Sequence, residues 1–364
     1  MKLRPSSAHI WVPCAAQPKM AAKAPAEVPS DPAREGTCAA WVAEMVLTGQ
    51  AAKTADLIGA THPNGWVVTK EMAAHVQPYV DVMRSYGGTV HVERKVVLNN
   101  LIEGTPDAFA VMDAEGVLRV KDLKYGFLIV EPYRNHQVSI YAGAILRFLT
   151  ARGVVIRKVV LSIYQPRAWH PAGIDREWST DPEELMRFVH EIEAAGLRTQ
   201  DPNAPATPGE HCHYCPAMST CPAAAHETYR VHDYLVADQQ RHMSAEEMAE
   251  ELLFLEKIEA MVTGRRKAVM AEAEARIGKG EFIPGWHMEA RSGKRRFKVP
   301  PEVVKFFTGI DPVVNSCVSP AELERMGASP AVVSKLSETP RLQPSLKRVT
   351  ANYYTNLFKG RPVK

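Results

Sequence analysis

The chain has 364 residues, which is enough for one large domain or two ordinary ones. Its composition is that of a globular protein, and a formal net charge of +3 is too small to indicate a nucleic-acid partner by itself. The sequence has no apolar run near the roughly 20 residues that a membrane-spanning helix needs, and its first residues have no apolar core of signal-peptide type. We therefore expect a cytoplasmic protein. Six cysteines in a chain of this length are not a disulfide framework.

Hydrophobic periodicity predicts the elements of an α/β domain in the first 235 residues. In chain order we expect a loop over 15–34, helices over 35–49 and 69–86, strands over 90–98, 107–112 and 117–124, a helix over 132–152, a strand over 154–164, a helix over 182–196 and a Pro-rich loop over 201–210. This order predicts a mixed central sheet flanked by helices.

The pattern changes after residue 235. Ser244 and Glu247 have the spacing of a capping box, which predicts the start of a long charged helix that ends near Gly278. A β-like segment over 282–297 follows. We therefore expect two domains, residues 1–235 and a helical and basic C-terminal extension over 236–364.

The second and third predicted strands are joined by a short polar loop that suits a hairpin. If Met112 pairs with Val117, Asp107 lies directly opposite Asp122. Lys124 shares the face of Asp122, because side chains alternate along a strand. Opposed carboxylates are destabilising unless a cation neutralises them, and Mg²⁺ typically takes one or two carboxylates. The pattern predicts a divalent-cation site; a solvated hairpin face is the alternative.

The next predicted helix places Gln137 and Tyr141 on one face, four residues apart. With Asp107 and the Asp122-x-Lys124 sequence before them, these residues resemble the motifs of the RecB-like branch of the PD-(D/E)XK nuclease superfamily. The resemblance covers roughly the first domain and extends to an uncharacterised, phage-associated subgroup. It implies a restriction-endonuclease-like α/β core in a bacterial or phage-encoded protein.

The resemblance also implies a function: Mg²⁺- or Mn²⁺-dependent hydrolysis of DNA, exonucleolytic rather than endonucleolytic, in recombination or DNA processing. In the family, two acidic residues and a backbone carbonyl bind the metal, a lysine assists the attack of water, and a glutamine and a tyrosine bind DNA or hold the site together. These roles carry over to Asp107, Asp122 and the Leu123 carbonyl as metal ligands, and to Lys124, Gln137 and Tyr141.

Glu93, in the preceding predicted strand, resembles an acidic residue that joins the site in some relatives; a surface carboxylate is the alternative. The chain departs from the family at Ala40, where RecB-like enzymes usually carry a metal-binding histidine. Either the ion has fewer protein ligands, or Glu35, Glu44 or Glu93 substitutes. A second function is therefore a DNA-end-binding protein that keeps the nuclease fold but has weakened catalysis.

Cys212, Cys215 and Cys221 lie within ten residues of one another. This spacing lets three sulfurs reach one centre, as in tetrahedral or cubane metal sites. The pattern resembles the [4Fe–4S] site of AddB-type and CRISPR-associated RecB-like nucleases, in which an N-terminal cysteine is the fourth ligand. Here that cysteine is Cys14 or Cys38, and we prefer Cys14 because its flanking sequence resembles the opening segment of the family.

Zn²⁺ is the alternative metal, because His211 and His213 stand beside the thiols and zinc accepts nitrogen and sulfur ligands. A zinc-stabilised assembly subunit is accordingly a third function.

A basic cluster in the C-terminal extension predicts a DNA-contacting surface; an ordinary basic surface is the alternative. The cluster comprises Arg291, Lys294, Arg295, Arg296 and Lys298. DNA is the expected partner, and a single-strand annealing or other recombination protein is a further candidate.

Overall fold

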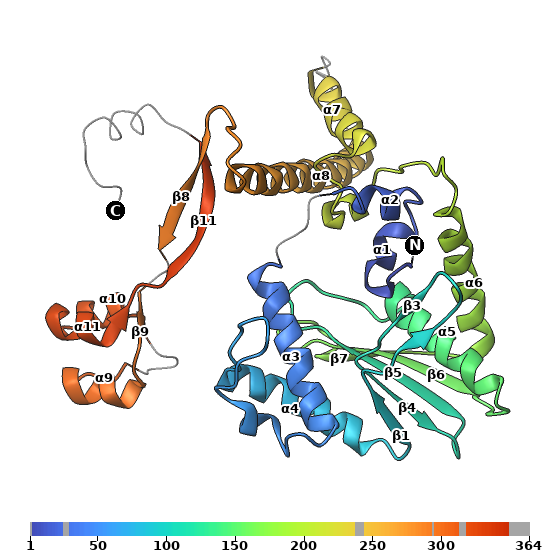
Figure 1. Cartoon of the computed structure of the whole chain (residues 1–364), viewed down its shortest axis with the longest axis horizontal. Coiled ribbons are helices and arrows are strands. Elements are labelled where there is room, and N and C mark those ends of the chain that lie inside the picture. The colour runs from blue at the N-terminus through green and yellow to red at the C-terminus, as the bar shows by residue number, and fades with distance from the viewer. Residues whose placement is uncertain (1, 25–28, 237–243, 293–294, 313–317, 349–364) are drawn as a thin grey trace. The chain divides into compact units, whose positions relative to one another are not determined.

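The computed structural model (Figure 1) describes residues 2–24, 29–236, 244–292, 295–312 and 318–348, with the backbone alone for 230–236, 290–292 and 341–348. The chain divides into two compact units, Met1–Arg266 and Lys267–Lys364. The division falls inside the long helix α8 (Ala245–Gly278), later in the chain than the boundary expected after residue 235.

A five-stranded mixed sheet forms the centre of the first unit, in the order β1-β4-β5-β6-β7. Its strands are β1 (Thr89–Val92), β4 (Ala108–Met112), β5 (Val117–Leu123), β6 (Lys158–Tyr164) and β7 (Asp175–Thr180). Strands β5 and β6 are parallel, and the other neighbours are antiparallel. The mixed α/β fold expected from the sequence is confirmed.

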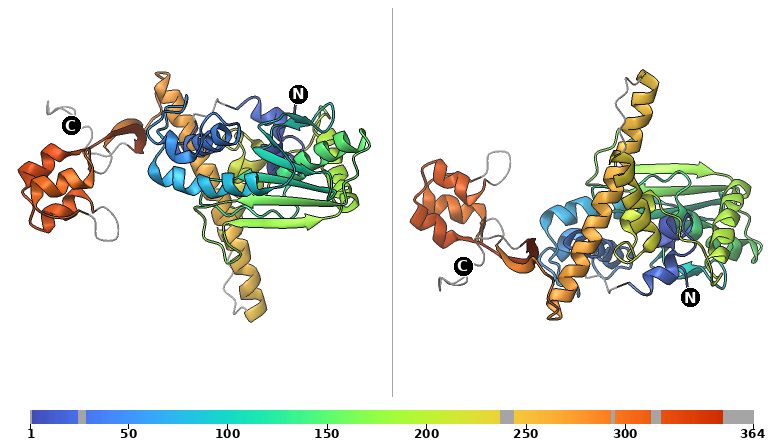
Figure 2. Two further views of the ribbon diagram at one scale, coloured as in Figure 1. Left: turned by 90° about the horizontal axis from the view of Figure 1, so that it is seen from below. Right: turned by 90° about the horizontal axis from the view of Figure 1, so that it is seen from above.

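Helices cover both faces of this sheet (Figures 1 and 2). Helices α3 (Asp31–Leu47) and α4 (Lys70–Ser85) form one apolar core with the first face, and α5 (His136–Thr150) and α6 (Pro182–Arg198) form another with the second. Along β5, Leu118 and Val120 belong to the core with α5, whereas Leu123 belongs to the core with α3 and α4. By this alternation Asp122 takes the α5 face.

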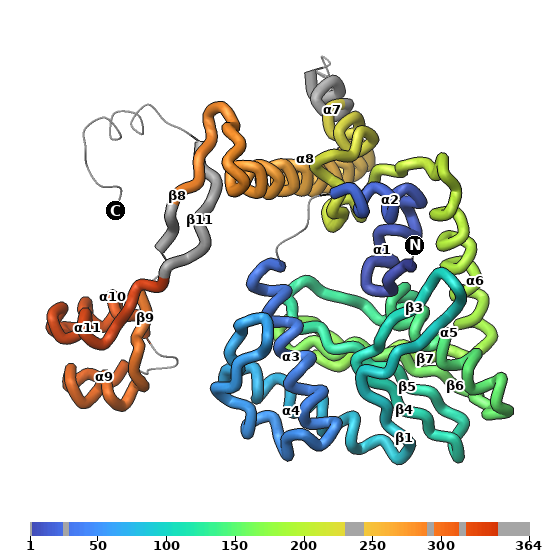
Figure 3. The backbone as a smooth tube through the Cα atoms, viewed as in Figure 1, coloured from blue at the N-terminus to red at the C-terminus, as the bar shows by residue number. Residues whose placement is uncertain are grey.

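Shorter elements surround the sheet and bring the start of the first unit beside a later segment. They are η1 (Pro5–Ser7), α1 (Ala8–Trp11), α2 (Gln17–Ala21), η2 (Thr54–Leu57), β2 (Val96–Val97), β3 (Glu103–Gly104), η3 (Glu210–Tyr214) and α7 (Pro222–Val236). The backbone trace in Figure 3 shows α1 and α2 next to the segment that follows α6. The Ala16 N–H donates to the Pro205 carbonyl at 3.3 Å, which joins chain segments almost two hundred residues apart.

Several predicted elements have different bounds in the structure, and two of these differences have a clear local cause. The strand expected over 90–98 is interrupted after β1, because Glu93 takes a left-handed backbone conformation with φ of 46°. Helix α5 begins at His136 rather than at Pro132, because the Asn135 side chain accepts a hydrogen bond of 3.0 Å from the Gln137 N–H and so caps the helix. The cap fixes where Gln137 lies in the first turn.

Sequence reasoning missed several short elements of the first unit, and also β7, α2 and α7. Strand β7 has the polar sequence Asp175–Thr180 and lies at the edge of the sheet, where one face of a strand can stay solvated. Helix α2 lies within the segment expected to be a loop, and α7 follows the cysteine cluster. Their short or weakly periodic patterns explain the omission.

The predicted capping box at the start of α8 is confirmed. The Ser244 N–H donates to a Glu247 carboxylate oxygen at 2.9 Å, and the Glu247 N–H donates to Ser244 Oγ at 3.2 Å. In the second unit β8 pairs with β11, β9 pairs with β10, and three short helices enclose a small core. Their bounds are β8 (Trp286–Ser292), β9 (Arg296–Phe297), α9 (Pro301–Thr308), α10 (Pro320–Arg325), α11 (Pro330–Leu336), β10 (Ser337–Glu338) and β11 (Arg341–Arg348). Across the described ranges, no helix has the length and apolar content needed to span a bilayer.

Candidate functional site

The carboxylate pair lies where β4 begins and β5 ends. Met112 pairs with Val117, as the hairpin pattern predicted, and this register places Asp107 opposite Asp122. The Leu123 N–H donates to Asp107 Oδ2 at 2.7 Å, so the first carboxylate is fixed by the backbone of the strand that carries the second. Antiparallel pairing thus brings together two acids that are fifteen positions apart.

The Lys124 and Gln137 side chains tie the end of β5 to the first turn of α5. Lys124 Nζ lies 2.8 Å from Asp122 Oδ2 and donates to Gln137 Oε1 at 2.9 Å. Gln137 Nε2 donates to Asp122 Oδ1 at 3.0 Å and to the Tyr141 hydroxyl at 3.3 Å. Asp122 is only 2% exposed. The structure therefore assembles Asp107, Asp122, Lys124, Gln137 and Tyr141 into one hydrogen-bonded group.

Gly104 allows a close approach behind this group. A Cβ at Gly104 would lie 2.7 Å from Pro5 Cγ and 3.0 Å from Tyr141 Cε1. Because only a glycine leaves room for both neighbours, the N-terminal turn η1 can pack against the helix that carries Tyr141.

The group has two carboxyl groups for one ammonium. Burial, together with the nearby charge of Asp122, raises the pKa of Asp107 to about 8. Burial by itself lowers the pKa of Lys124, but the charge of Asp122 and the contact with it outweigh that effect and raise the pKa overall. The Lys124 ammonium therefore stays protonated and balances Asp122, whereas Asp107 holds a proton near neutral pH unless a further cation is bound.

Glu93 and Glu44 add acidity near the pair. The Glu93 N–H donates to the Asp107 carbonyl at 3.1 Å, so Glu93 continues the edge of the sheet beside Asp107. Burial raises the pKa of the Glu93 carboxyl to about 7, and the charges of Glu44 and Asp122 contribute. Glu44 lies on α3 one turn after Ala40, and hence on the same helix face.

Glu35 has a different partner. Its carboxylate forms an ion pair with Arg167, the residue whose guanidinium also lies 4.8 Å from the centre of the Tyr125 ring. Of the three acids that could substitute for a histidine at position 40, Glu93 lies near the carboxylate pair and Glu44 lies near Glu93, whereas Glu35 is held by Arg167.

Two residues near the group were missed by sequence reasoning. Tyr79 is fully buried on α4, and its hydroxyl donates to the Lys121 carbonyl at 3.4 Å. Burial, followed by the charges of Asp107 and Asp122, raises its pKa well above the usual value. Burial lowers the pKa of His9, on α1, and the charges of Lys124 and His211 lower it further. Neither residue lies in a recognisable motif, since only packing places them there.

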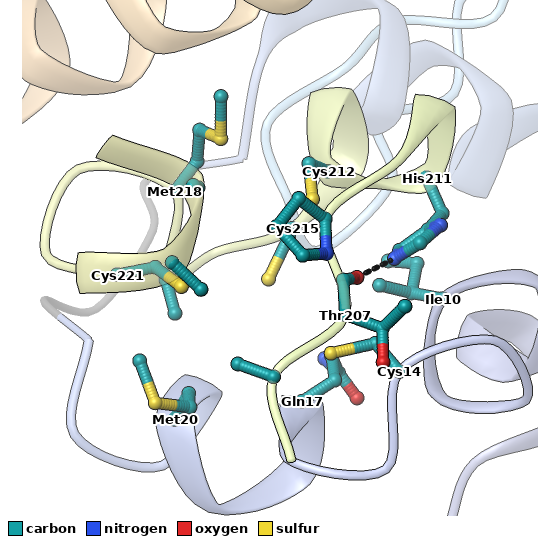
Figure 4. A pocket seen from close by; sticks show the side chains of 15 residues that line it. Ile10, Cys14, Gln17, Met20, Thr207, His211, Cys212, Cys215, Met218 and Cys221 are labelled. Atoms are coloured by element: carbon teal, nitrogen blue, oxygen red, sulfur yellow. Dashed lines mark hydrogen bonds between the residues drawn. The ribbon is translucent and has the colours of Figure 1, made fainter. Parts of the chain in front are cut away.

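The predicted cysteine site is assembled from both ends of the first unit. Cys14, Cys212, Cys215 and Cys221 line one pocket, together with apolar side chains that include Met20 and Met218. Figure 4 shows the four sulfur atoms around a common space, with Cys14 approaching from the N-terminal segment.

Cys38 lies apart from this pocket. It is fully buried in the core that α3 and α4 form with the sheet. Burial raises the pKa of the Cys215 thiol to about 11, and the other pocket thiols Cys212, Cys14 and Cys221 contribute. The geometry thus places Cys14, and not Cys38, beside the three clustered cysteines.

The two histidines next to the cysteines have other contacts. His211 lines the pocket, but its Nε2 lies 2.9 Å from the Thr207 carbonyl oxygen. His213 packs against α8, where a Cβ at Gly264 would lie 3.0 Å from its Nδ1. Arg265, the next residue of α8, donates to the Met218 carbonyl. Through these contacts His211, His213 and α8 hold the cysteine segment in place.

In the part of the chain that the structure describes, no three or more His, Cys, Asp or Glu side chains are arranged with metal-ligand geometry. The chemistry of the donors nevertheless differs clearly between the two groups. Carboxylate and carbonyl oxygens suit Mg²⁺ or Mn²⁺, whereas thiolates suit iron–sulfur clusters or Zn²⁺.

The predicted basic cluster is partly neutralised. Arg295 pairs with Glu324 at 2.7 Å, and Arg296 pairs with Glu338 at 3.0 Å. Lys294 and the side chain of Arg291 lie outside the described residues, as does the tail after residue 348. Lys298 is described, and its backbone N–H donates to the Leu336 carbonyl at 2.8 Å. The arginines that are described contact acids of their own unit.

Residues 1–337 match the model of a family described as "Protein of unknown function (DUF2800)". The chain belongs to the DUF2800 family. Among solved structures, this DUF2800 protein is similar to one named "Putative exonuclease" from Eubacterium rectale. The identity is 10% and the TM-score 0.35, over 68% of this chain and 92% of the other. At this TM-score the likeness is distant.

Proposed function

We propose that this DUF2800 protein is a metal-dependent DNA nuclease whose active centre contains Asp107, Asp122 and Lys124. The observation that carries the proposal is the opposed pair of carboxylates, with a single ammonium placed between Asp122 and Gln137. Two carboxyl groups buried side by side cannot both ionise cheaply unless a cation balances their charge, and the raised pKa of Asp107 reflects that cost. The donor set of two carboxylates and the adjacent Leu123 carbonyl fits a hard divalent cation.

Such a cation, Mg²⁺ or Mn²⁺, would withdraw charge from a phosphodiester and lower the pKa of bound water. Lys124 would stabilise negative charge that develops on the phosphate or orient the attacking water. Gln137 holds both Asp122 and Lys124, so it fixes their separation, and Tyr141 supports Gln137 from the next turn. Glu93 and Glu44 are the residues that could supply a further ligand in place of the histidine that RecB-like nucleases carry.

The finer proposal is exonucleolytic hydrolysis of DNA in phage or bacterial recombination or DNA processing. The support is the order and spacing of the motifs, which resemble those of RecB-like nucleases. A protein that anneals single strands, or another recombination protein, is the partner that such a reaction would serve.

We also propose that Cys14, Cys212, Cys215 and Cys221 hold a [4Fe–4S] cluster, with Zn²⁺ as the alternative. Four thiols around one pocket are the donor set that such clusters use. The cluster would be structural, because it would join the N-terminal segment to the segment that follows α6. The contacts of His211 with Thr207 and of His213 with α8 favour the all-cysteine set over a zinc site with histidine ligands.

A second candidate function is binding of DNA ends with weakened catalysis. It is favoured by Ala40, which cannot bind a metal. The placement of Glu44 one turn later on the same helix face is the observation that argues against a complete loss of turnover.

Cleavage of linear DNA in Mg²⁺ or Mn²⁺ tests the proposal. The wild-type protein should degrade linear DNA, and Asp122→Asn should lower the rate by at least about a thousandfold, since it removes charge-stabilising interactions worth several kcal/mol. Asp113→Asn is the matched control, because Asp113 is an exposed aspartate in the loop of the same hairpin. This variant should cleave DNA at the wild-type rate. Binding of DNA without cleavage by the wild type would favour the second function. Equal cleavage by the Asp122 and Asp113 variants would remove the carboxylate pair from the mechanism.

A further inference from the structure

We propose that the apolar loop, defined as Phe127, Leu128 and Ile129 together with Trp169, is a stacking surface for unpaired bases at a DNA end. The proposal rests on the proposed nuclease function and deepens it, because it names single-stranded DNA, or a frayed end, as the preferred substrate.

The position of the loop links it to the candidate active centre. Residues 124–135 connect the end of β5 to the start of α5; Lys124 is the first residue of this connection, and Gln137 lies in the first turn of α5 just after it. These two side chains are hydrogen-bonded at 2.9 Å, so the loop begins and ends at the proposed centre. A strand whose phosphodiester lies at that centre would have its neighbouring bases within reach of the loop.

The loop exposes an unusual amount of apolar surface. Phe127 is 66% exposed, Leu128 68% and Ile129 52%. Trp169, in the loop after β6, is 84% exposed. Single exposed apolar residues are common, but three consecutive ones are typical of binding surfaces.

Buried polar residues hold the loop in place. Gln165 is completely buried, and its Nε2 donates to the carbonyls of Gly126 at 2.9 Å and Leu128 at 2.7 Å. Its Oε1 accepts from the Val130 N–H at 3.2 Å and from Arg176 at 2.8 Å. Burying a glutamine and an arginine is costly unless their hydrogen bonds are made, and here those bonds order an exposed loop. The apolar side chains are therefore displayed from a fixed backbone.

Further contacts join the two loops that carry the surface. The Arg167 guanidinium lies 4.2 Å from the centre of the Phe127 ring, and His170 pairs with Glu131 at 3.0 Å. Because Arg167 covers one face of the Phe127 ring while the side chain stays two-thirds exposed, the ring presents its remaining surface to solvent.

The charges around the loop select the kind of ligand. Arg167 is paired with Glu35, and Glu131 lies near both His170 and Arg176, so the cations are matched by acids. Such a surface offers little attraction to phosphates, which depend on unpaired cations. It suits the flat faces of bases, which stack on aromatic side chains without regard to sequence. Bases in a paired helix are covered by their neighbours, so only unpaired bases can use it.

The binding of labelled oligonucleotides to the full chain tests the proposal, with Asp122→Asn in every variant so that no strand is cut. Phe127→Ala should weaken binding of a single strand by about 5- to 150-fold, the range expected for the loss of one stacking contact between a base and an aromatic side chain. It should change binding of a blunt duplex by less than about twofold. Phe306→Ala is the matched control, because Phe306 is an 82% exposed phenylalanine on α9 outside the loop. It should bind single strands like its parent.

An abasic strand separates stacking from other causes. A strand that lacks bases at its end should bind equally to the Phe127→Ala variant and its parent, because there is no base to lose. In a strand with 2-aminopurine at the same positions, binding to the parent should quench the 2-aminopurine fluorescence. Binding to Phe127→Ala should quench it less. Thermal unfolding should show both variants equally folded, since substitutions of exposed side chains change stability little.

Unchanged single-strand binding by Phe127→Ala, or equal weakening on normal and abasic strands, would overturn the proposal and favour a protein partner for the loop. The proposed nuclease function can fail separately. If the unmodified chain cuts no DNA but Phe127 still controls base binding, the stacking surface stands and the nuclease function does not. If the chain cuts DNA but Phe127→Ala has no effect on binding, the nuclease function stands and the stacking surface does not.

Discussion

The carboxylate group and the cysteine pocket are built in opposite ways. The carboxylate group comes from one continuous segment, Asp107 to Tyr141, in which strand register and a capped helix place each side chain. The cysteine pocket joins Cys14 to residues about two hundred positions later, and most of its wall comes from turns and short helices. The first site is determined locally, whereas the second depends on the whole unit having folded.

This difference predicts how each site responds to damage. Changes in the carboxylate group should affect chemistry more than stability, because the hairpin and α5 have large apolar cores of their own. Changes in the cysteine pocket should affect stability more than chemistry, because the pocket links distant segments of chain. The following predictions test that contrast, beginning with the largest expected effect.

Cys215→Ser should remove the bound metal and lower the free energy of unfolding by several kcal/mol, because a structural metal binds the folded state alone. Protein purified without oxygen should contain roughly four iron and four sulfide per chain if the site is a [4Fe–4S] cluster. Cys14→Ser should lose the metal as well. Cys38→Ser, the control from the other core, should keep it. Metal analysis and thermal unfolding measure both effects, and a wild-type chain that holds one zinc and no iron would contradict the cluster.

Lys124→Met should lower the cleavage rate by about a hundredfold to a thousandfold, the range for removal of one charge-stabilising donor. Its effect on stability should be smaller than that of Lys121→Met. Lys121 lies on the same strand but faces away, is fully buried, and pairs with Asp175 at 2.5 Å. Breaking a fully buried pair costs about 3–5 kcal/mol, and this one should cost less because Asp175 is 29% exposed. Steady-state rates and urea unfolding of both variants give the comparison; the reverse ranking would contradict the assigned roles.

Gly104→Ala should destabilise the first unit by about 1–3 kcal/mol, because its Cβ would overlap Pro5 and crowd Tyr141. Gly36→Ala is the control at a second glycine, and its effect on stability should have the opposite sign. Gly36 lies inside α3, and a Cβ there would have no neighbouring atom within 4 Å, so alanine should stabilise the helix by about 0.5–1 kcal/mol. Thermal unfolding of the two variants should show midpoints on opposite sides of the wild type. Equal midpoints would show that η1 can move away from α5 at no cost.

The smallest effect is expected at the basic cluster. Joint replacement of Lys294, Arg295 and Arg296 by alanine should flatten the dependence of DNA binding on salt, by at most about 0.9 log units for each phosphate that the variant no longer neutralises. The change should be well below that expected for three phosphates, because Arg295 and Arg296 are paired with Glu324 and Glu338. The salt slope of duplex binding measures it. An unchanged slope and affinity would mean that the cluster does not touch DNA.

Elements that repeat a simple period, and the residues that such elements bring together, could be predicted from the amino-acid sequence. The register of the hairpin follows from a short loop between alternating strands, so the opposition of Asp107 and Asp122 could be predicted. The placement of Gln137 and Tyr141 on one helix face follows from the helical repeat. The capping box at Ser244 and Glu247 is local in the same way.

Only the tertiary structure decided which distant residues meet. The sequence left Cys14 and Cys38 as two candidates for the fourth cysteine of the pocket. The packing of the N-terminal segment against residues 205–221 brings Cys14, and not Cys38, to that pocket. Tyr79 approaches the carboxylates, and Glu44 approaches Glu93, because α3 and α4 pack on the sheet. The Gln165 hydrogen bonds that order the apolar loop likewise join separate strand ends. Local periods carry no information about such contacts, since they depend on how whole elements pack. That is the physical reason why the register of the hairpin could be predicted from the sequence while its surroundings could not.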